Sequence, residues 1–190
     1  MLRQLRPALV ILGTFTILLG IGYPLTITGL AQAFFNRQAN GSLIIEKGTV
    51  IGSELIGQPF SDPRYFWGRL SATPGFAYNA SSSSGSNFGP GNPALLAAVQ
   101  ARIEALRAVD PDNTQPIPVD LVTASASGLD PDISLAAALY QVGRVARYRG
   151  LPTEILMALV EKHTTGRQFG ILGEPRVNVL KLNLALDSLK

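Results

Sequence analysis

A long uncharged segment near the N-terminus constrains this chain more than any other feature. No charged side chain occurs from Pro7 to Phe35, a run of 29 residues, whereas Arg3 and Arg6 precede it and Arg37 follows it. As a helix this run would rise roughly 43 Å, which exceeds the ~30 Å hydrocarbon core of a bilayer. We therefore predict that residues 1–35 are a transmembrane anchor and that residues 36–190 form a separate domain.

A second interpretation treats the same segment as a secretory signal. Met1 to Arg6 then form its basic beginning, and Ala31-Gln32-Ala33 is typical of a cleavage site. Cleavage there would release a secreted soluble binding protein. The apolar run, however, is about twice as long as the usual 7–15 residues of a signal peptide. Its length favours a retained anchor.

Small residues occur at helical spacing along the anchor. Small faces let helices approach closely in lipid, where packing drives association. We predict that both faces pack against partner helices and that Pro24, which lies between them, kinks the helix. One face carries Gly13, Thr16 and Gly20, and the opposite face carries Gly22, Thr26, Gly29 and Ala33.

The charges that flank the anchor predict its orientation. Arg3, Arg6 and the terminal amine outweigh Arg37 and Lys47 by a small margin. Because cytoplasmic flanks carry the excess of Lys and Arg, we expect a single-pass protein with its N-terminus in the cytoplasm. Residues 36–190 are then extracytoplasmic, on the side without cytosolic ATP.

Composition narrows the class of the domain. Beyond Phe35 there are 14 Lys and Arg against 13 Asp and Glu, so that part carries a net charge of +1. No block of like charges accompanies the pI of 9.4, and we therefore expect no nucleic-acid partner. The chain has no cysteine, which excludes disulfides, thiol catalysis and cysteine-ligated metals within it.

The pattern beyond the anchor predicts one mixed α/β (α+β) domain with about four helices and a small sheet. The aromatic cluster Tyr65-Phe66-Trp67 is expected to pack in its core. A polar stretch at residues 73–93 predicts a long loop that is either functional or mobile. We expect strands at residues 41–45, 49–56 and 119–123, and helices at 93–109, 131–149, 152–163 and 178–189.

The side chains provide no clear catalytic constellation. The only histidine, His163, lies near the end of a predicted helix, where it is expected to interact with the helix dipole rather than with a metal. Neither a G-x-S-x-G turn nor a P-loop occurs. Phosphate could meet Arg144, Arg147 and Arg149, although a solvated basic helix face is the favoured explanation for them. We therefore predict neither a catalytic residue nor a metal site.

The chain nevertheless resembles the family of small C subunits of the Kdp potassium-transporting P-type ATPase. No single matching segment is diagnostic, but together they follow one order along nearly the whole chain. They are GYPL (22–25), TGLAQ (28–32), ANGSLI (39–44), GSELIGQ (52–58), YF (65–66), GSNFGP (85–90), VDLVTA (119–124), SGLDP (127–131), HT (163–164), GEPRVNVL (173–180) and LNLALD (182–187). Asn36, Leu70 and Asp132 depart from the expected pattern, and Asp132 stands where a second histidine is common.

The resemblance implies an accessory subunit of a high-affinity potassium uptake complex in the bacterial inner membrane. Its partners would be the bilayer, a channel-like potassium-selective subunit, a P-type ATPase subunit and a very small peptide subunit. The family is described as stabilising the assembly and as a catalytic chaperone that raises the ATP affinity of the pump subunit. No cofactor is expected to bind tightly, and ATP would act through the complex.

A nucleotide site has been proposed for this family through a glutamine, which corresponds to Gln141 here. Together with Arg144 and Arg147, this residue would form a nucleotide site on a regulatory, cytoplasmic domain. The predicted orientation conflicts with that role, because an external domain does not meet cytosolic ATP. We therefore favour a structural role at the outer mouth of the potassium path, with the loop at residues 73–93 near the entrance.

Overall fold

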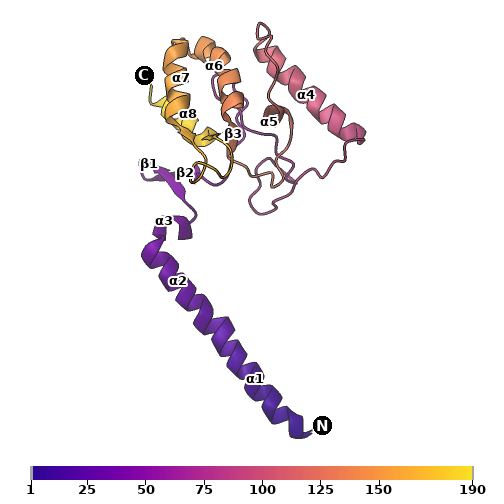
Figure 1. Cartoon of the computed structure of the whole chain (residues 1–190), viewed down its shortest axis with the longest axis vertical. Coiled ribbons are helices and arrows are strands. Elements are labelled where there is room, and N and C mark those ends of the chain that lie inside the picture. Colours follow the sequence, from indigo (N-terminus) through magenta and orange to yellow (C-terminus); the bar gives the residue numbers. More distant parts are fainter. Residues whose placement is uncertain (1, 190) are drawn as a thin grey trace. The chain divides into compact units, whose positions relative to one another are not determined.

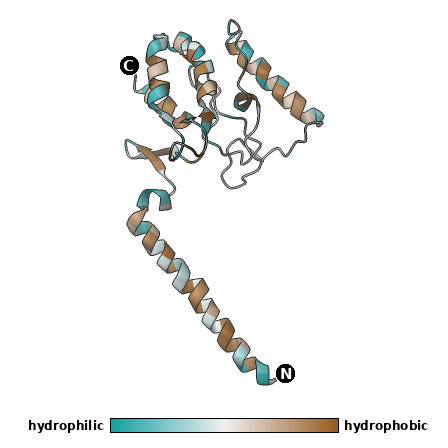
Figure 2. Ribbon diagram, viewed as in Figure 1, coloured by the Kyte–Doolittle hydropathy of each residue, from teal (hydrophilic) through white to brown (hydrophobic). Residues whose placement is uncertain are grey.

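The computed structural model describes residues 2–189, and these divide into a membrane unit, residues 2–51, and a domain unit, residues 52–189. The membrane unit begins with a short 3-10 turn at Leu2–Gln4, followed by α1 (Leu5–Ile17), a π-helical turn at Leu18–Gly22, α2 (Tyr23–Phe34) and α3 (Asn36–Ala39) (Figure 1). The helix from Leu5 to Phe34 contains an 18-residue stretch with a mean hydropathy of 2.0, and no part of that stretch is buried. Along this helix, hydrophobic stretches alternate with paler ones, and the N-terminal end is hydrophilic (Figure 2).

Pro24 changes the anchor locally without ending it. Proline has no N–H, and its ring crowds the carbonyl one turn earlier. The helix widens into the π-turn just ahead of this residue, where the Tyr23 N–H bonds to the Leu18 carbonyl. The Thr26 hydroxyl donates to the Gly22 carbonyl at 2.8 Å. The predicted kink thus takes the form of a wide turn within one continuous helix.

A polar cluster follows the apolar helix. The side-chain amides of Asn36 and Asn40 donate to the Gln32 amide oxygen at 2.9 and 3.1 Å. Strands β1 (Leu43–Glu46) and β2 (Thr49–Ser53) then form a hairpin. Its turn residues Lys47 and Gly48 have φ values of 49° and 80°, as a tight hairpin turn requires. The two strands predicted here are confirmed.

The domain unit contains the predicted four main helices and a small sheet, so the mixed α/β class is confirmed. The sheet is antiparallel with strand order β3-β5-β4, and Val177 at its centre lies opposite both Ile133 and Thr164. The helices are α4 (Pro93–Val109), α5 (Val119–Val122), α6 (Leu135–Arg149), α7 (Thr153–Lys162) and α8 (Val179–Asp187), and the strands are β3 (Asp132–Ser134), β4 (Thr164–Thr165) and β5 (Arg176–Asn178).

Helix boundaries follow their capping residues. The Asn92 side chain accepts from the Ala94 N–H at 2.9 Å, and Asn178 caps α8 by accepting from the Lys181 N–H at 3.0 Å. Gly150 ends α6 with a left-handed φ of 65°. The helices predicted at residues 93–109, 152–163 and 178–189 are therefore confirmed within a few residues.

Two sequence predictions were wrong. Residues 119–123 form the short helix α5 rather than a strand, because Pro118 precedes a single turn that the Thr123 hydroxyl closes onto the Val119 carbonyl. A short segment with three apolar residues does not distinguish the two states. The helix predicted from residue 131 begins only at Leu135. Residues 132–134 pair with β5 instead, and Ser134 is the helix cap.

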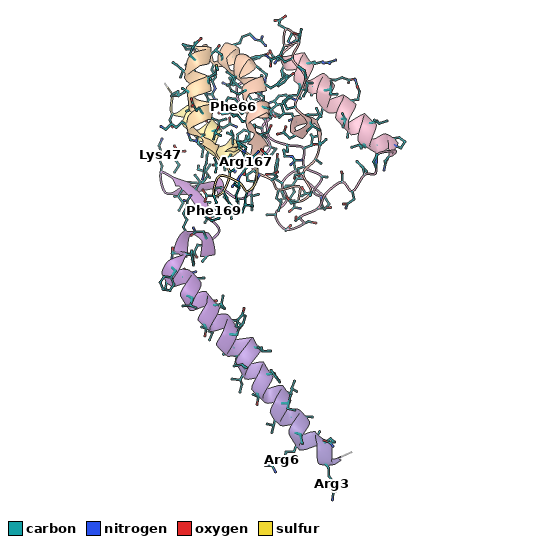
Figure 3. All side chains as sticks on the ribbon, viewed as in Figure 1. Arg3, Arg6, Lys47, Phe66, Arg167 and Phe169 are labelled. Carbon is teal, nitrogen blue, oxygen red and sulfur yellow. The ribbon has the colours of Figure 1, made fainter. Side chains whose placement is uncertain are left out.

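The core lies where α6, α7, α8 and the sheet meet around the segment that contains Phe66. Phe66 is fully buried and Trp67 is 4% exposed, which confirms the predicted packing of the aromatic cluster (Figure 3). The other members of the core come from every main element of the domain. They include Leu106, Leu121, Ile133, Val145, Leu156, Val160, Val177, Leu182 and Leu186.

Hydroxyl groups fix the long polar loop at residues 73–93 to the domain. The Ser71 hydroxyl accepts from the Tyr78 N–H at 2.8 Å and donates to the Gly128 carbonyl at 2.7 Å. The Ser84 N–H bonds to the Ser127 carbonyl at 3.0 Å. Gly128 has a φ of 68°, and a Cβ there would lie 2.6 Å from the Ser84 carbonyl oxygen. The loop is therefore held in place by side chains and close packing, without regular secondary structure.

Candidate functional site

Helix α6 carries the three predicted nucleotide-binding residues, and its start is well defined. The Ser134 hydroxyl accepts from the Ala137 N–H at 3.0 Å. The Ser134 N–H in turn donates to an Asp120 carboxylate oxygen at 2.8 Å. This cap, with a carboxylate near the positive end of the helix, fixes which side of α6 faces the core.

Gln141 is 1% exposed and faces the aromatic segment. Its Oε1 accepts from the Trp67 N–H at 2.8 Å, and its Nε2 donates to the Trp67 carbonyl at 3.0 Å. The same Nε2 also donates to the Ala137 carbonyl at 3.2 Å. Both ends of this amide are thus used inside the domain, as buried polar groups require.

Arg144 is also buried, at 1% exposure, and it adjoins Gln141. Its guanidinium donates to Gln141 Oε1 at 2.6 Å and to the Pro63 carbonyl, and its Cζ lies 4.9 Å from the centroid of the Trp67 ring. Burial lowers the pKa of Arg144 to about 10. The solvated basic helix face is therefore wrong for this arginine.

A second cation contacts the same indole. The Cζ of Arg102, on α4, is also 4.9 Å from the Trp67 ring centroid. Its guanidinium donates to the carbonyls of Leu121 and Gly68, both at 2.9 Å. Burial lowers the pKa of Arg102 as well. The guanidinium groups of the buried Arg144 and the partly buried Arg102 thus contact one aromatic ring and several backbone carbonyls. The ring quadrupole and the carbonyl dipoles both attract a cation.

A second amide, which the sequence analysis did not single out, repeats the arrangement on α8. Asn183 Oδ1 accepts from the Phe66 N–H at 2.9 Å, and its Nδ2 donates to the Phe66 carbonyl at 2.9 Å. Two helices therefore supply side-chain amides to the backbone of two consecutive residues. A buried asparagine on the apolar face of a predicted helix was the available signal, because such a residue needs hydrogen-bond partners.

Arg147 is separated from the other two predicted residues. Its side chain is half-exposed, and it donates to an Asp110 carboxylate oxygen at 2.9 Å and to the Val109 carbonyl at 3.1 Å. It lines a cavity of about 710 Å³ whose walls also carry Asp112 and Tyr140. The structure thus brings Gln141 and Arg144 together and places Arg147 beside two carboxylates.

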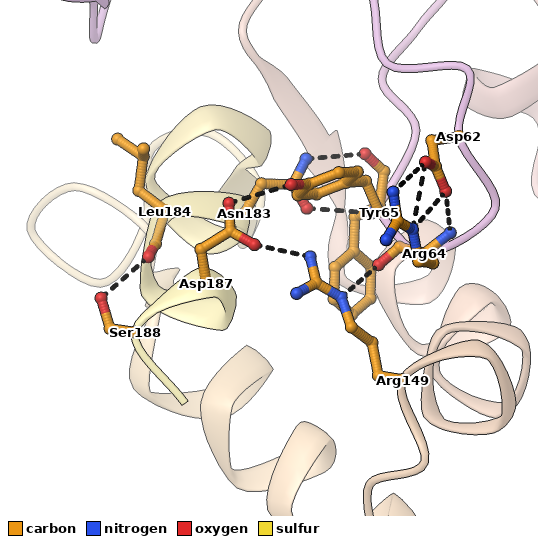
Figure 4. Close-up of polar contacts among 9 residues, drawn as sticks. Asp62, Arg64, Tyr65, Arg149, Asn183, Leu184, Asp187 and Ser188 are labelled. Carbon is orange, nitrogen blue, oxygen red and sulfur yellow. Dashed lines mark hydrogen bonds and ion pairs between the residues drawn. The ribbon is translucent and has the colours of Figure 1, made fainter. Parts of the chain in front are cut away.

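Arg149 links the end of α6 to α8. It donates to Asp187 at 2.7 Å and to the Arg64 carbonyl at 3.0 Å, and it lies over the Tyr65 ring (Figure 4). The Tyr65 hydroxyl donates to the same Asp187 at 3.1 Å. Arg149 therefore joins the segment that precedes Phe66 to the last helix of the domain.

His163 lies at the C-cap of α7, as predicted, but its electrostatics differ from the expectation. Burial, followed by the positive charges of Lys162 and Lys181, lowers the pKa of His163. The helix dipole acts in the opposite direction, because it favours the charged ring. Among residues 2–189, no group of three or more His, Asp or Glu side chains is arranged to hold a metal ion.

The small residues of the anchor pack against no other helix in the membrane unit. An added Cβ at Gly13, Gly20 or Gly29 would meet no atom within 4 Å, and at Gly22 only the Ile17 carbonyl oxygen at 3.6 Å. The other predicted packing residues, Thr16, Thr26 and Ala33, are exposed on the same bare helix. All seven positions are therefore open to a partner.

Comparison with known proteins connects these features to one family. The family model described as "KdpC: K+-transporting ATPase, c chain" matches residues 5–188. The chain is 64% identical over 190 residues to the potassium-transporting ATPase KdpC subunit of Methylococcus capsulatus, with all of both chains covered. It is 63% identical to the proteins of the same name from Herpetosiphon aurantiacus, with 97% of this chain and 96% of that one covered, and Variovorax paradoxus, with 97% and 95% covered. These matches cover nearly the whole chain. The chain therefore belongs to the KdpC family, the c chain of the potassium-transporting ATPase.

Proposed function

We propose that this chain is a non-catalytic subunit that holds the potassium-transporting complex together from its extracytoplasmic side. In this role the anchor packs in the bilayer against the channel-like subunit and its neighbours, including the P-type ATPase subunit and the small peptide subunit. The domain lies outside the cytoplasm, over the entrance of the potassium path. The membrane is the bacterial inner membrane.

The bare anchor is the observation that carries this proposal. A helix of 30 residues that contains an unburied 18-residue stretch with a mean hydropathy of 2.0 needs lipid or other helices around it. Open space at its glycines allows close approach of another helix. The domain, by contrast, uses its buried cations and amides on its own backbone, which fits a structural body better than a reaction centre.

The family is described as raising the ATP affinity of the pump subunit. In our proposal this effect arises from a conformational change of the complex. An external domain does not touch ATP, so it alters the ATP affinity of a pump subunit only by contacting two states of the complex differently. The domain then stabilises the state that binds ATP more tightly. Removing the domain lowers ATP affinity without removing any nucleotide ligand.

The nucleotide site at Gln141, Arg144 and Arg147 stays a prediction. A nucleotide that used Gln141 and Arg144 would have to replace their bonds to Trp67 and Pro63. Substitution of Arg147 distinguishes a nucleotide-binding domain from a structural one, because this side chain is half-exposed and can be changed without opening the core. If the domain is cytoplasmic and binds nucleotide, Arg147→Ala weakens the ATP affinity of the assembled complex. If our proposal holds, that affinity stays unchanged.

The absence of cysteine makes orientation directly measurable. Single cysteines are introduced at the exposed Ala80, in the polar loop, and at Gln4, ahead of the anchor. Intact cells with the assembled complex are treated with a membrane-impermeant maleimide. We expect labelling at position 80 before permeabilisation and at position 4 only after it. The reverse pattern would place the domain in the cytoplasm and overturn the proposal.

A further inference from the structure

Three large apolar side chains project from the loop between β4 and β5. Phe169 is 91% exposed, Ile171 is 75% exposed and Leu172 is 54% exposed. We call these three residues the apolar tip, and Figure 3 labels Phe169 on it. Exposed apolar side chains are ordinary when they are scattered singly, but three within four residues form a patch that marks an interaction site.

Hydrogen bonds and an ion pair within the loop close the apolar tip. Gln168 and Leu172 exchange backbone hydrogen bonds at 2.8 and 2.9 Å, and Arg167 donates to both carboxylate oxygens of Glu174 at 2.8 and 2.7 Å. Phe169 sits at a φ of 53°, a left-handed conformation that is unfavourable for a bulky residue. A pre-organised loop loses little entropy on binding, which favours a shaped protein pocket as its target.

An apolar cavity adjoins the base of the same loop. It has a volume of about 730 Å³, and Gly166 and Pro175, which flank the apolar tip, form part of its wall. Leu139 from α6 and Met157 from α7 line it and are 43% and 50% exposed. We call it the α6/α7 cavity. The tip and the cavity together form one surface that has both a projecting and a hollow part.

The charges around this surface identify the chemistry of its partner. Glu154 and Glu161 line the α6/α7 cavity, and neither forms an ion pair within the described part of the chain. Arg167 is neutralised by Glu174. The surface therefore offers a partner unpaired negative charge beside apolar area. An anionic lipid surface would be repelled by these carboxylates, whereas a polypeptide with a Lys or Arg would be attracted.

We propose that the apolar tip and the α6/α7 cavity together dock an external segment of another subunit of the same complex. That segment provides an apolar pocket for Phe169 and an apolar side chain for the cavity, with at least one Lys or Arg facing Glu154 and Glu161. The inference rests on the proposed function, because it requires the domain to be assembled with other subunits.

Photo-crosslinking in the full complex tests the surface directly. A photoreactive amino acid replaces Phe169, and a matched one replaces Phe76, which is 66% exposed on the polar loop. We expect crosslinks from position 169 to one subunit, at a peptide with apolar residues and a neighbouring Lys or Arg, and a different or absent crosslink from position 76. Crosslinks from position 169 to lipid alone, or none in a complex that assembles normally, would overturn the inference.

Dissociation of the purified complex provides the second test. Phe169→Ser should accelerate loss of this subunit roughly 10- to 100-fold, as removal of a central aromatic anchor does. Glu154→Lys with Glu161→Lys should also accelerate it, and more at low salt than at high salt. Glu104→Lys, on the exposed side of α4, is the control for added charge.

The outcomes separate this inference from the proposed function. The emission of Trp67, the only tryptophan, reports whether each variant keeps its fold. If the unaltered chain does not assemble with the other subunits, the proposed function fails. If it assembles but Phe169→Ser dissociates at the unaltered rate, the docking surface alone is wrong.

Discussion

The side chain of Gln141 bonds to both backbone groups of Trp67, with Oε1 accepting at 2.8 Å and Nε2 donating at 3.0 Å. Asn183 makes the same pair of bonds to Phe66, both at 2.9 Å. Helices α6 and α8 each hold the backbone of one of these two consecutive residues. Side-chain amides thus take the place that neighbouring strands have in a sheet.

Gln141→Ala should therefore destabilise the domain. It leaves the buried N–H and carbonyl of Trp67 without partners and removes a contact of Arg144, which together cost about 2–4 kcal/mol in the free energy of unfolding. Urea unfolding of the full chain in detergent, followed by Trp67 emission, measures the effect. The control is Gln100→Ala, whose exposed amide donates to Glu104 on α4 and should cost less than about 0.5 kcal/mol.

The same variant discriminates between the structural and nucleotide roles of Gln141. Equal stability of the two glutamine variants, combined with a weaker ATP affinity of the complex only for Gln141→Ala, would contradict the structural role.

His163 should make stability depend on pH in the physiological range. Its folded-state pKa is lowered below the ordinary 6.5, so the unfolded chain takes up the proton first as the pH falls. Stability should therefore decrease as the pH drops below about 6.5 and level off once the folded state is also protonated. Because the chain has one histidine, a single imidazole resonance reports its titration by NMR.

His163→Gln is the matched variant for this prediction. It should lose less stability than the unaltered chain between pH 7.5 and pH 5.5. A titration midpoint above 6.5 in the folded chain would show that the helix dipole outweighs burial and the charges of Lys162 and Lys181.

Gly128→Ala should release the polar loop at residues 73–93. The new Cβ would lie 2.6 Å from both the Ser84 carbonyl oxygen and Thr73 Cγ2, at a φ of 68°. We expect a loss of about 1–3 kcal/mol and faster proteolytic cleavage near residues 80–90. Gly150 has a similar φ of 65° with open space around it. Gly150→Ala therefore measures the cost of a left-handed alanine without any steric clash. Equal proteolysis of the two variants would contradict the close packing at Gly128.

Leucine at Gly20 or Gly29 should weaken association of the anchor with its partners. The larger side chain prevents close helix approach, and a loss of about 1–2 kcal/mol corresponds to roughly 5- to 30-fold weaker association. Co-purification with the other subunits measures it. Leu19→Phe, which enlarges a residue outside the small faces, is the control. Domain stability should not change, and equal co-purification of all variants would contradict the predicted packing faces.

The sequence predicted the elements that have local signals. Asn92, Asn178 and Gly150 mark helix ends through caps that act within one turn, and the uncharged anchor is evident from its length. It did not predict β3, because pairing of Ile133 with Val177 depends on residues more than 40 positions away. Asp130-Pro131 has the sequence of a helix start, but the residues that follow it pair with β5 instead. The true cap, Ser134, has the same local chemistry and lies four residues later.

For the candidate site, the sequence indicated which residues to consider but not what they contact. Arg144 was singled out for contact with phosphate, and Gln141 through the nucleotide site proposed for the family that the chain resembles. No helical spacing reveals that Trp67 lies against both side chains. The apolar tip had no periodic signal at all. Its three exposed residues become evident only when the backbone bonds of Gln168 and the Arg167–Glu174 pair are seen to close the loop.

The paired amides also determine when the domain can finish folding. Gln141 follows Trp67 by 74 positions, and Asn183 follows Phe66 by 117. Synthesis therefore delivers the aromatic segment long before either of its clamps, and the backbone of Phe66 stays bonded to water until the last helix emerges. Contacts of such long sequence separation form late and slow the process. A chain truncated ahead of residue 183 leaves the core open, so quality control in the cell can recognise an incomplete subunit before it joins the pump.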